Sequence, residues 1–212
     1  MTMYDEMFVK WNRLCGIFDT IGNNRREFIF NQIYTNYQEH NNRTYHNLEH
    51  IRNSLRIVNY VSNLIYRERY MLMAIWFHDI ICVAGSPTNE KDSADLMRLC
   101  LGGAIDDSLI DDITELIMVT KHPLKTPIDM DHRYMLDIDL SILGSDEDEY
   151  GRYSTQIRDE YSSFTLSQYI DGRVTFLRSL LDMDHIYRTP LFRKSFERQA
   201  TLNITREIRI LS

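Results

Sequence analysis

An almost wholly apolar run that ends in two polar residues constrains the fold of this chain most. Residues 71–77 read Met-Leu-Met-Ala-Ile-Trp-Phe, and His78 and Asp79 follow at once. The run predicts a buried helix over about Arg67 to Ile81, with His78 and Asp79 at its end. A buried polar group is costly without a partner, so other parts of the chain must supply partners for these two side chains.

The composition favours helices over strands. Eight glycines and four prolines occur in 212 residues, whereas helix-forming residues are plentiful throughout. No low-complexity stretch and no Pro/Gly/Ser-rich linker divides the chain, and its length suffices for one sizeable core. We therefore predict an all-α protein with a single domain over residues 1–212.

Apolar residues recur at three- and four-residue steps along most of the chain, which is the spacing of amphipathic helices. Two such helices, marked by Phe8 to Phe18 and by Ile29 to Tyr37, precede the first candidate histidines. Further helices are expected beyond Leu48, from near Glu90, from Leu109 to Thr120, over roughly Asp131 to Leu143, and near Glu147 to Ser163, Thr165 to Leu181 and Thr189 to Leu211.

Charge and cysteine content limit the classes of partner and compartment. The formal net charge is −7 and no block of Lys and Arg occurs, so duplex nucleic acid is not an expected partner; a few local arginines would still suffice for a small anion. Cys15, Cys82 and Cys100 show no CxxC spacing. This pattern argues against a disulfide framework or a thiolate metal site and fits a reducing cytosol.

The N-terminal segment is acidic and lacks a secretory apolar region, and the longest apolar run is too short to span a membrane. We expect a soluble, cytoplasmic protein that does not associate with membranes. The abundant Tyr and Met residues are assigned to the core by default, and a homodimer stays an open alternative.

Two histidines upstream of the apolar run could join His78 and Asp79 at a metal site. His46 and His50 are four positions apart, so on a helix their side chains would share one face, where one could bind a metal and the other handle protons. The alternative is a pair of solvent-exposed histidines on a helix. Imidazole nitrogens and carboxylate oxygens suit a divalent cation such as Mn²⁺, Fe²⁺, Zn²⁺ or Mg²⁺.

A distal carboxylate could complete the set. Asp137 and Asp139 would point about 200° apart on a helix, so only one of them can readily face the cluster. Asp139 is the better candidate, since it falls between Met135 and Ile142 on an inward-facing stripe where a metal would compensate its charge. Asp137 is either a hydrogen-bond acceptor behind the ligands or a solvated charge.

Three further residues have both a functional and an ordinary interpretation. Glu90 could orient a water or accept a proton, but an acid in the first turn of a helix is also favoured electrostatically. Arg43 is a candidate phosphate clamp, because guanidinium donors match phosphate oxygens, or else an exposed arginine. His122, after Thr120 and Lys121, is open in the same way.

This pattern resembles the HD superfamily of metal-dependent phosphohydrolases, which are helical proteins. Their ligands are a first His, a His-Asp pair and a distal Asp, which correspond here to His50, His78, Asp79 and Asp139. The segment Tyr45-His46-Asn47 followed by His50 is also similar to the histidine helix of cyclic-nucleotide phosphodiesterases. There the earlier histidine protonates the leaving oxygen, which implies that His46 is a general acid.

The resemblance extends over roughly residues 43–203 to a group of small predicted HD phosphohydrolases of bacteria and phages. It implies core motifs at about 43–144 and a C-terminal helical extension at about 145–212. The matching segments include Arg43-Thr-Tyr-His46, Trp76-Phe-His-Asp79, Asn89-Glu90, Leu136-Asp-Ile-Asp139, Ile157-Arg158 and Gly172-Arg173. The loop from Ile80 to Asn89 departs from the pattern, because it lacks the aromatic and acidic residues expected there.

We therefore expect hydrolysis of a phosphoester or phosphoanhydride bond in a small molecule, with a nucleotide as the leading candidate. Asp79 would bind the metal and help orient a water, and His46 would protonate the departing oxygen. Residues that could hold phosphate charge or contact the substrate are Arg43, Lys121, His122 and Arg158.

Two other functions remain as alternatives. Some HD-fold proteins use two irons and dioxygen, and His122 and His132 could supply extra ligands, although both lie close in sequence to Asp139. The other alternative is a non-catalytic module that senses a nucleotide, against which the intact ligand set argues.

Overall fold

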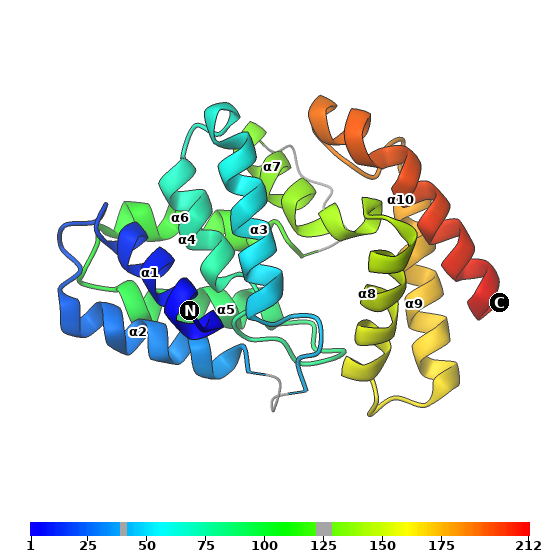
Figure 1. Cartoon of the computed structure of the whole chain (residues 1–212), viewed down its shortest axis with the longest axis horizontal. Helices are drawn as coiled ribbons and strands as arrows, with labels where there is room; N and C mark the ends of the chain where they lie inside the picture. Colours follow the sequence, from blue (N-terminus) through cyan, green and yellow to red (C-terminus); the bar gives the residue numbers. More distant parts are fainter. Residues whose placement is uncertain (39–41, 122–128) are drawn as a thin grey trace. The chain divides into compact units, whose positions relative to one another are not determined.

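The computed structural model describes residues 1–38, 42–121 and 129–212. These residues form α-helices joined by short connections and 3-10 segments, and they contain no β-strand, which confirms the predicted all-α class. Among the described residues, no helix has the length and apolar character needed to cross a membrane. The chain divides into two compact units, Met1–His122 and Pro123–Ser212 (Figure 1). The expected division into core motifs and a C-terminal extension stays a prediction.

The first unit is built around one buried helix, α4 (Glu68–Phe77). Trp76 and Phe77 are almost fully buried there, and four helices of the unit pack against α4: α1, α3, α5 and α6 (Figure 1). The described elements of this unit are α1 (Met3–Cys15), α2 (Asn23–Asn36), α3 (Leu48–Val61), η2 (Ser62–Leu64), α4, α5 (Asn89–Leu101) and α6 (Asp107–Met118). The apolar run therefore occupies the centre of the unit, as its composition predicts.

Helix α4 ends at Phe77, earlier than the predicted Ile81. The chain turns after His78, and the backbone groups that a longer helix would pair internally bond to other segments instead. The Ser93 hydroxyl, from α5, accepts from the Ile81 N–H at 3.0 Å and donates to the Ile81 carbonyl at 3.1 Å. Tertiary hydrogen bonds thus place His78 and Asp79 in a turn that directly follows the buried helix.

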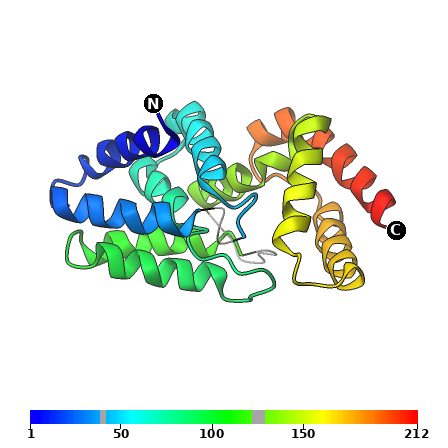
Figure 2. The ribbon, with the colours of Figure 1, turned by 60° about the horizontal axis from the view of Figure 1, so that its bottom comes forward.

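The second unit consists of α7 (Met130–Asp139), η3 (Leu140–Gly144), α8 (Glu147–Glu160), α9 (Leu166–Leu181) and α10 (Pro190–Leu211). The predicted helix from Asp131 to Leu143 is thus an α-helix that tightens into a 3-10 segment. Helix α10 packs against η3, α8 and α9. Figure 2 shows α8, α9 and α10 as neighbours. Asn203 on α10 donates to the carbonyls of Leu143 and Ser145, each at 2.9 Å, and so satisfies the end of η3.

Candidate metal centre

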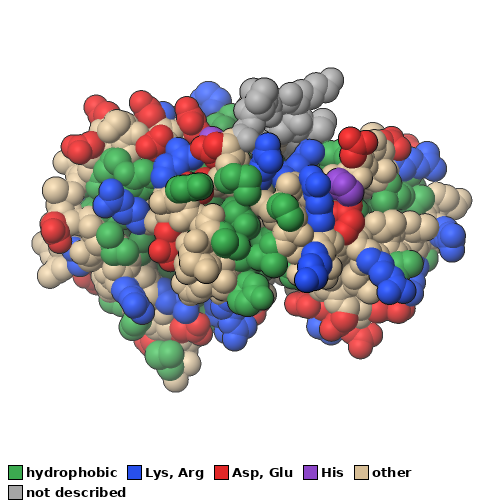
Figure 3. All heavy atoms as spheres, turned by 90° about the horizontal axis from the view of Figure 1, so that it is seen from above, with side chains coloured by type: hydrophobic (Ala, Val, Ile, Leu, Met, Phe, Trp, Pro, Cys, Tyr) green, Lys and Arg blue, Asp and Glu red, His purple; other side chains and the backbone are tan. Residues whose placement is uncertain are grey.

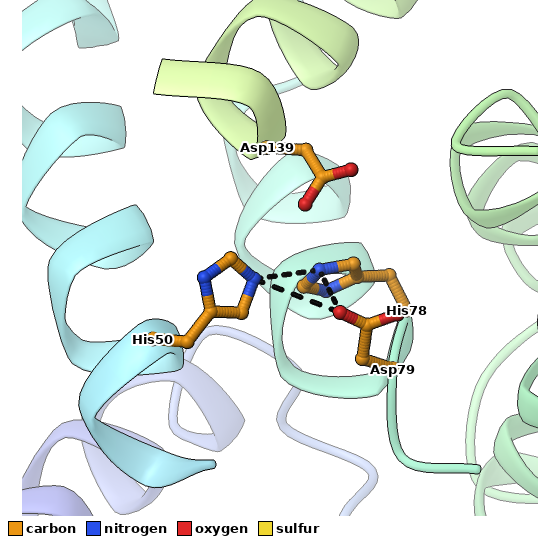
Figure 4. A group of neighbouring side chains, drawn as sticks. All are labelled: His50, His78, Asp79 and Asp139. Carbon is orange, nitrogen blue, oxygen red and sulfur yellow. Dashed lines mark hydrogen bonds and ion pairs between the residues drawn. The ribbon is translucent and has the colours of Figure 1, made fainter. Parts of the chain in front are cut away.

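Three side chains of the first unit converge on one point (Figure 4). The Nε2 atoms of His50 and His78 are 3.1 Å apart. Oδ2 of Asp79 lies 3.1 Å from Nε2 of His78 and 3.6 Å from Nε2 of His50. His50 comes from the first turn of α3, and the other two come from the turn after α4. The structure thus brings together residues that are far apart in the sequence.

These separations fit a shared divalent ion. Two ligand atoms that each lie about 2.1 Å from one ion are about 3.0 to 3.6 Å apart when they subtend roughly 90° to 120° at it. All three separations in the cluster match that range. The side chains of His50 and His78 are almost fully buried, whereas that of Asp79 is 19 % exposed. The imidazoles therefore form the side of the cluster that is shielded from solvent, and the carboxylate forms the side that solvent reaches.

A hydrogen bond orients the His78 ring. Its Nδ1 atom lies 3.0 Å from the carbonyl oxygen of Ile75, one turn earlier in α4. Because a carbonyl oxygen only accepts, Nδ1 carries the proton, and Nε2 presents its lone pair to the cluster. This arrangement is common behind metal-binding histidines, where it fixes both the tautomer and the direction of the ring.

Asn47 positions His50. It is the N-cap of α3, and its Oδ1 accepts from the N–H groups of Glu49 at 2.8 Å and His50 at 3.4 Å. Its Nδ2 donates to the carbonyls of Arg43 at 3.4 Å and Thr44 at 2.9 Å. No capping role was predicted for Asn47, although an asparagine directly before an apolar helical period is a recognisable capping signal.

His46 lies beside the cluster, but not for the reason expected. Helix α3 begins at Leu48, so His46 precedes the helix, and the proposed helical four-residue spacing with His50 is wrong. Asn47 is the N-cap, so the helix begins only after it and His46 lies outside the helix. The loop nevertheless brings the two rings to a centroid distance of 6.0 Å, with Nε2 of His46 4.0 Å from Oδ2 of Asp79. The His46 side chain is 24 % exposed, so solvent reaches it.

Arg43 is buried, with 4 % of its surface exposed, so the alternative of an exposed arginine is wrong. Its guanidinium donates to the backbone carbonyls of His46, Asp79 and Ile80 at 3.0, 2.6 and 2.8 Å. These bonds link the loop before α3 to the turn after α4. The expected contact of Arg43 with a substrate phosphate stays a prediction.

Two other predicted site residues of the first unit, Glu90 and Lys121, lie in α5 and shortly after α6 (Asp107–Met118). Glu90 is half-buried in the first turn of α5. Lys121 is exposed, and its Nζ donates to the Pro87 carbonyl at 2.8 Å. The prediction for His122 lies outside the described residues. Figure 3 shows acidic and basic side chains interspersed on the face that it draws.

Asp137 and Asp139 both belong to α7 in the second unit, and Asp137 is not the solvated charge that was one of its two interpretations. It is fully buried, and its carboxylate accepts from the N–H groups of Arg188 at 2.6 Å and Thr189 at 2.7 Å, at the start of α10. Burial raises the pKa of Asp137 to about 6, against the opposing effect of these hydrogen bonds. Asp139, also drawn in Figure 4, is the last residue of α7, and its part in the ligand set is proposed below.

Arg158, a further predicted substrate contact, braces a turn within the second unit. It donates to the carbonyls of Tyr161 at 2.8 Å and Phe164 at 3.4 Å, between α8 and α9. Its cationic carbon also lies 4.9 Å from the centre of the Tyr169 ring. These contacts explain the conformation of Arg158, and its contact with a substrate stays a prediction.

Comparison of the chain with protein-family models, with curated proteins and with solved structures finds no match. The geometry of the site defines a group of histidine and aspartate side chains able to hold a divalent metal ion.

Proposed function

We propose that this protein is an HD-type, metal-dependent hydrolase that cleaves a phosphoester or phosphoanhydride bond in a small molecule, with a nucleotide as the leading candidate. The observation that carries the proposal is the convergence of His50, His78 and Asp79 at separations of 3.1 to 3.6 Å. Nitrogen and oxygen ligands of this kind suit Mn²⁺, Fe²⁺, Zn²⁺ or Mg²⁺.

Asp139 is proposed as the fourth ligand. Two neutral imidazoles and two carboxylates would together balance the charge of a divalent cation, whereas His50, His78 and Asp79 alone would leave one positive charge uncompensated. Four ligands would also leave positions open for water and substrate on an ion that accepts more than four, such as Mn²⁺ or Mg²⁺. The resemblance to the HD superfamily supports the same choice.

A divalent ion bound there would lower the pKa of a water bound to it and would polarise a phosphoryl oxygen. The open edge of the Asp79 carboxylate is suited to orient that water, since it is the solvent-exposed member of the cluster. His46 is proposed as the group that delivers a proton to the leaving oxygen. Its support is its position 4.0 Å from Asp79, together with its access to solvent.

Auxiliary roles are proposed for residues at the periphery. Glu90 would accept or relay a proton, and Lys121 would hold phosphate charge, since both belong to the first unit and reach solvent at least in part. His132 pairs with Asp129 at 2.8 Å within α7 and its preceding cap, and His122 lies outside the described residues. No specific observation therefore favours the two-iron alternative.

The test is a screen of the Mn²⁺-loaded protein against nucleotide mono-, tri- and cyclic phosphates, with phosphate and nucleoside products both measured. We expect His78→Ala and Asp79→Ala to abolish turnover. Each should weaken Mn²⁺ binding by more than the roughly 10- to 100-fold loss that is typical when a residue hydrogen-bonded to a metal ligand is replaced. Helical content, measured by circular dichroism, should be retained.

Matched controls are His185→Ala and Asp95→Ala, whose side chains are 47 % and 55 % exposed and are not among the candidate ligands. Both variants should keep wild-type turnover and Mn²⁺ affinity. Full activity in His78→Ala or Asp79→Ala, or wild-type protein that binds no divalent metal, would contradict the proposal.

A further inference from the structure

The guanidinium of Arg43 connects the two segments that carry the candidate ligands. Nη1 donates to the carbonyl oxygen of His46 at 3.0 Å and to that of Asp79 at 2.6 Å, while Nη2 donates to that of Ile80 at 2.8 Å. The first carbonyl belongs to the loop before α3, and the other two belong to the turn after α4. One buried side chain therefore sets the distance between these segments.

The ring of Tyr37, the C-cap of α2, packs against the Arg43 guanidinium. The cationic carbon of Arg43 lies 5.1 Å from the centre of the Tyr37 ring, within the range of a cation–π contact. The Tyr37 hydroxyl donates to the carbonyl of Trp76, in the last turn of α4, at 3.3 Å. Burial raises the pKa of Tyr37 well above its usual range, so the hydroxyl remains a neutral donor.

The electrostatics favour a cation at this position. Carbonyl oxygens at the end of a helix carry partial negative charge, and α4 ends at Phe77, directly before the turn that Arg43 binds. The guanidinium is planar with several donors in fixed directions, so it can satisfy three carbonyls at once, which the single ammonium of a lysine matches less well.

The connection continues to His50 through Asn47. The Asn47 side chain donates to the Arg43 and Thr44 carbonyls and accepts from the His50 N–H. A displacement of Arg43 would therefore move the start of α3, where His50 lies, relative to the turn that holds His78 and Asp79.

We propose that Arg43 is a positioning residue, which holds His50 and the His78-Asp79 pair at the separation that a single metal ion requires, rather than a clamp for substrate phosphate. This inference rests on the proposed function, because it assigns Arg43 a role in metal binding. A clamp and a positioning residue differ in what their loss affects. Loss of a clamp weakens phosphate binding at unchanged metal affinity, whereas loss of a positioning residue weakens the metal site itself.

The experiment titrates Mn²⁺ into wild-type protein and into Arg43→Met, with electron paramagnetic resonance to follow the bound ion. Binding of inorganic phosphate is then measured on each protein at saturating Mn²⁺. We expect Mn²⁺ affinity to fall roughly 10- to 100-fold in Arg43→Met, as for other residues that orient metal ligands through hydrogen bonds. Phosphate affinity at saturating Mn²⁺ should stay within about twofold, which is less than 0.5 kcal/mol.

Arg25→Met is the matched control. Arg25 also donates to backbone carbonyls of a distant segment in the same unit, those of Cys100 at 3.0 Å and Gly102 at 2.7 Å, but it does not touch the candidate ligands. This variant should lose thermal stability without losing Mn²⁺ affinity. Arg43→Lys keeps the charge and part of the donor set, so it should bind Mn²⁺ with an intermediate affinity; it also provides the test if Arg43→Met fails to fold.

Wild-type Mn²⁺ affinity in Arg43→Met, or in Arg43→Lys if only that variant folds, would overturn the inference while leaving the proposed function intact. So would a loss of phosphate binding at unchanged Mn²⁺ affinity, which would identify Arg43 as a clamp. Absence of Mn²⁺ binding in wild-type protein would overturn both the inference and the proposed function.

Discussion

Two aspartates two residues apart in α7 illustrate how position within a helix decides the task of a side chain. Asp137 is fully buried and accepts two backbone N–H groups at the start of α10, whereas Asp139 is half-buried at the end of α7. The carboxylate of Asp137 thus satisfies donors that a helix cannot satisfy internally. Its hydrogen bonds indicate a structural function, and only Asp139 is proposed as a ligand.

Replacing Asp137 by asparagine should destabilise the protein. An amide offers one acceptor oxygen and turns an N–H₂ group toward the second backbone donor, so one of the two N–H groups loses its partner. We expect the free energy of unfolding to fall by about 1 to 3 kcal/mol, measured by urea denaturation at neutral pH. Asp171→Asn, at an exposed position of α9, is the control and should be neutral. Equal unfolding midpoints for the two variants would contradict the assigned role of Asp137.

The ends of the elements are set by contacts with other elements. Helix α4 gives way to a turn at the place where Arg43 and Ser93 bond its following backbone groups. Helix α7 is followed by η3, which ends at Gly144, where α10 approaches closely. A Cβ atom at Gly144 would lie 2.6 Å from Cβ of Phe196 on α10. Glycine is therefore needed at position 144 for the close packing of η3 and α10.

Alanine at Gly144 should therefore weaken the packing of α10 on η3. Neither backbone can yield without moving its own element, so we expect a loss of about 1 to 3 kcal/mol in the free energy of unfolding. Gly172→Ala in α9 is the matched control, because an added Cβ there meets nothing within 4 Å. Alanine favours the helix, so this control should stabilise by up to about 1 kcal/mol. A stabilising effect of Gly144→Ala in thermal or urea unfolding would refute the packing argument.

At the scale of the whole chain, each of the two units has its own stabilising centre. The first is organised around the buried helix α4, with the candidate ligands at its end. The second contains a buried ion pair that joins α9 to α10. The Arg173 guanidinium donates to both oxygens of Glu207, at 2.8 and 3.0 Å, and the Tyr150 hydroxyl of α8 donates to the same carboxylate at 2.5 Å.

This ion pair predicts a pH dependence of stability. Burial alone would raise the pKa of Glu207, but the hydrogen bond and charge of Arg173 outweigh it, so the pKa lies below its usual value of 4.5. An acid with a lowered pKa stabilises the folded state above its unfolded pKa, and this contribution is lost as the pH falls through the folded pKa. The contribution of Glu207 should therefore be complete at neutral pH and decrease below about pH 4.5.

Glu207→Gln tests this expectation. At pH 7 it leaves Arg173 buried without its counter-charge, which should cost about 3 to 5 kcal/mol in urea unfolding. The difference from wild type should narrow as the pH is lowered below 4.5 and through the lowered pKa of Glu207, where the carboxylate takes up a proton. Glu147→Gln, in the exposed pair with Arg206, should change stability by less than about 1 kcal/mol. A difference for Glu207→Gln that is constant over this pH range would contradict the argument.

The sequence by itself determined the all-α class and the approximate course of most helices, because helical periodicity and the scarcity of glycine and proline are local signals. Residue types and spacing also indicated His46, His50, His78 and Asp79 as candidates, and the resemblance to the HD superfamily implied that His50 is the ligand. The position of His46 outside α3 is set locally by the cap at Asn47, a signal that the sequence already contains. The tertiary structure alone decided that Arg43 binds three carbonyls and that Asp137 binds the start of α10. Both depend on hydrogen bonds between segments distant in sequence, and the burial that makes such bonds necessary exists only once the chain has folded.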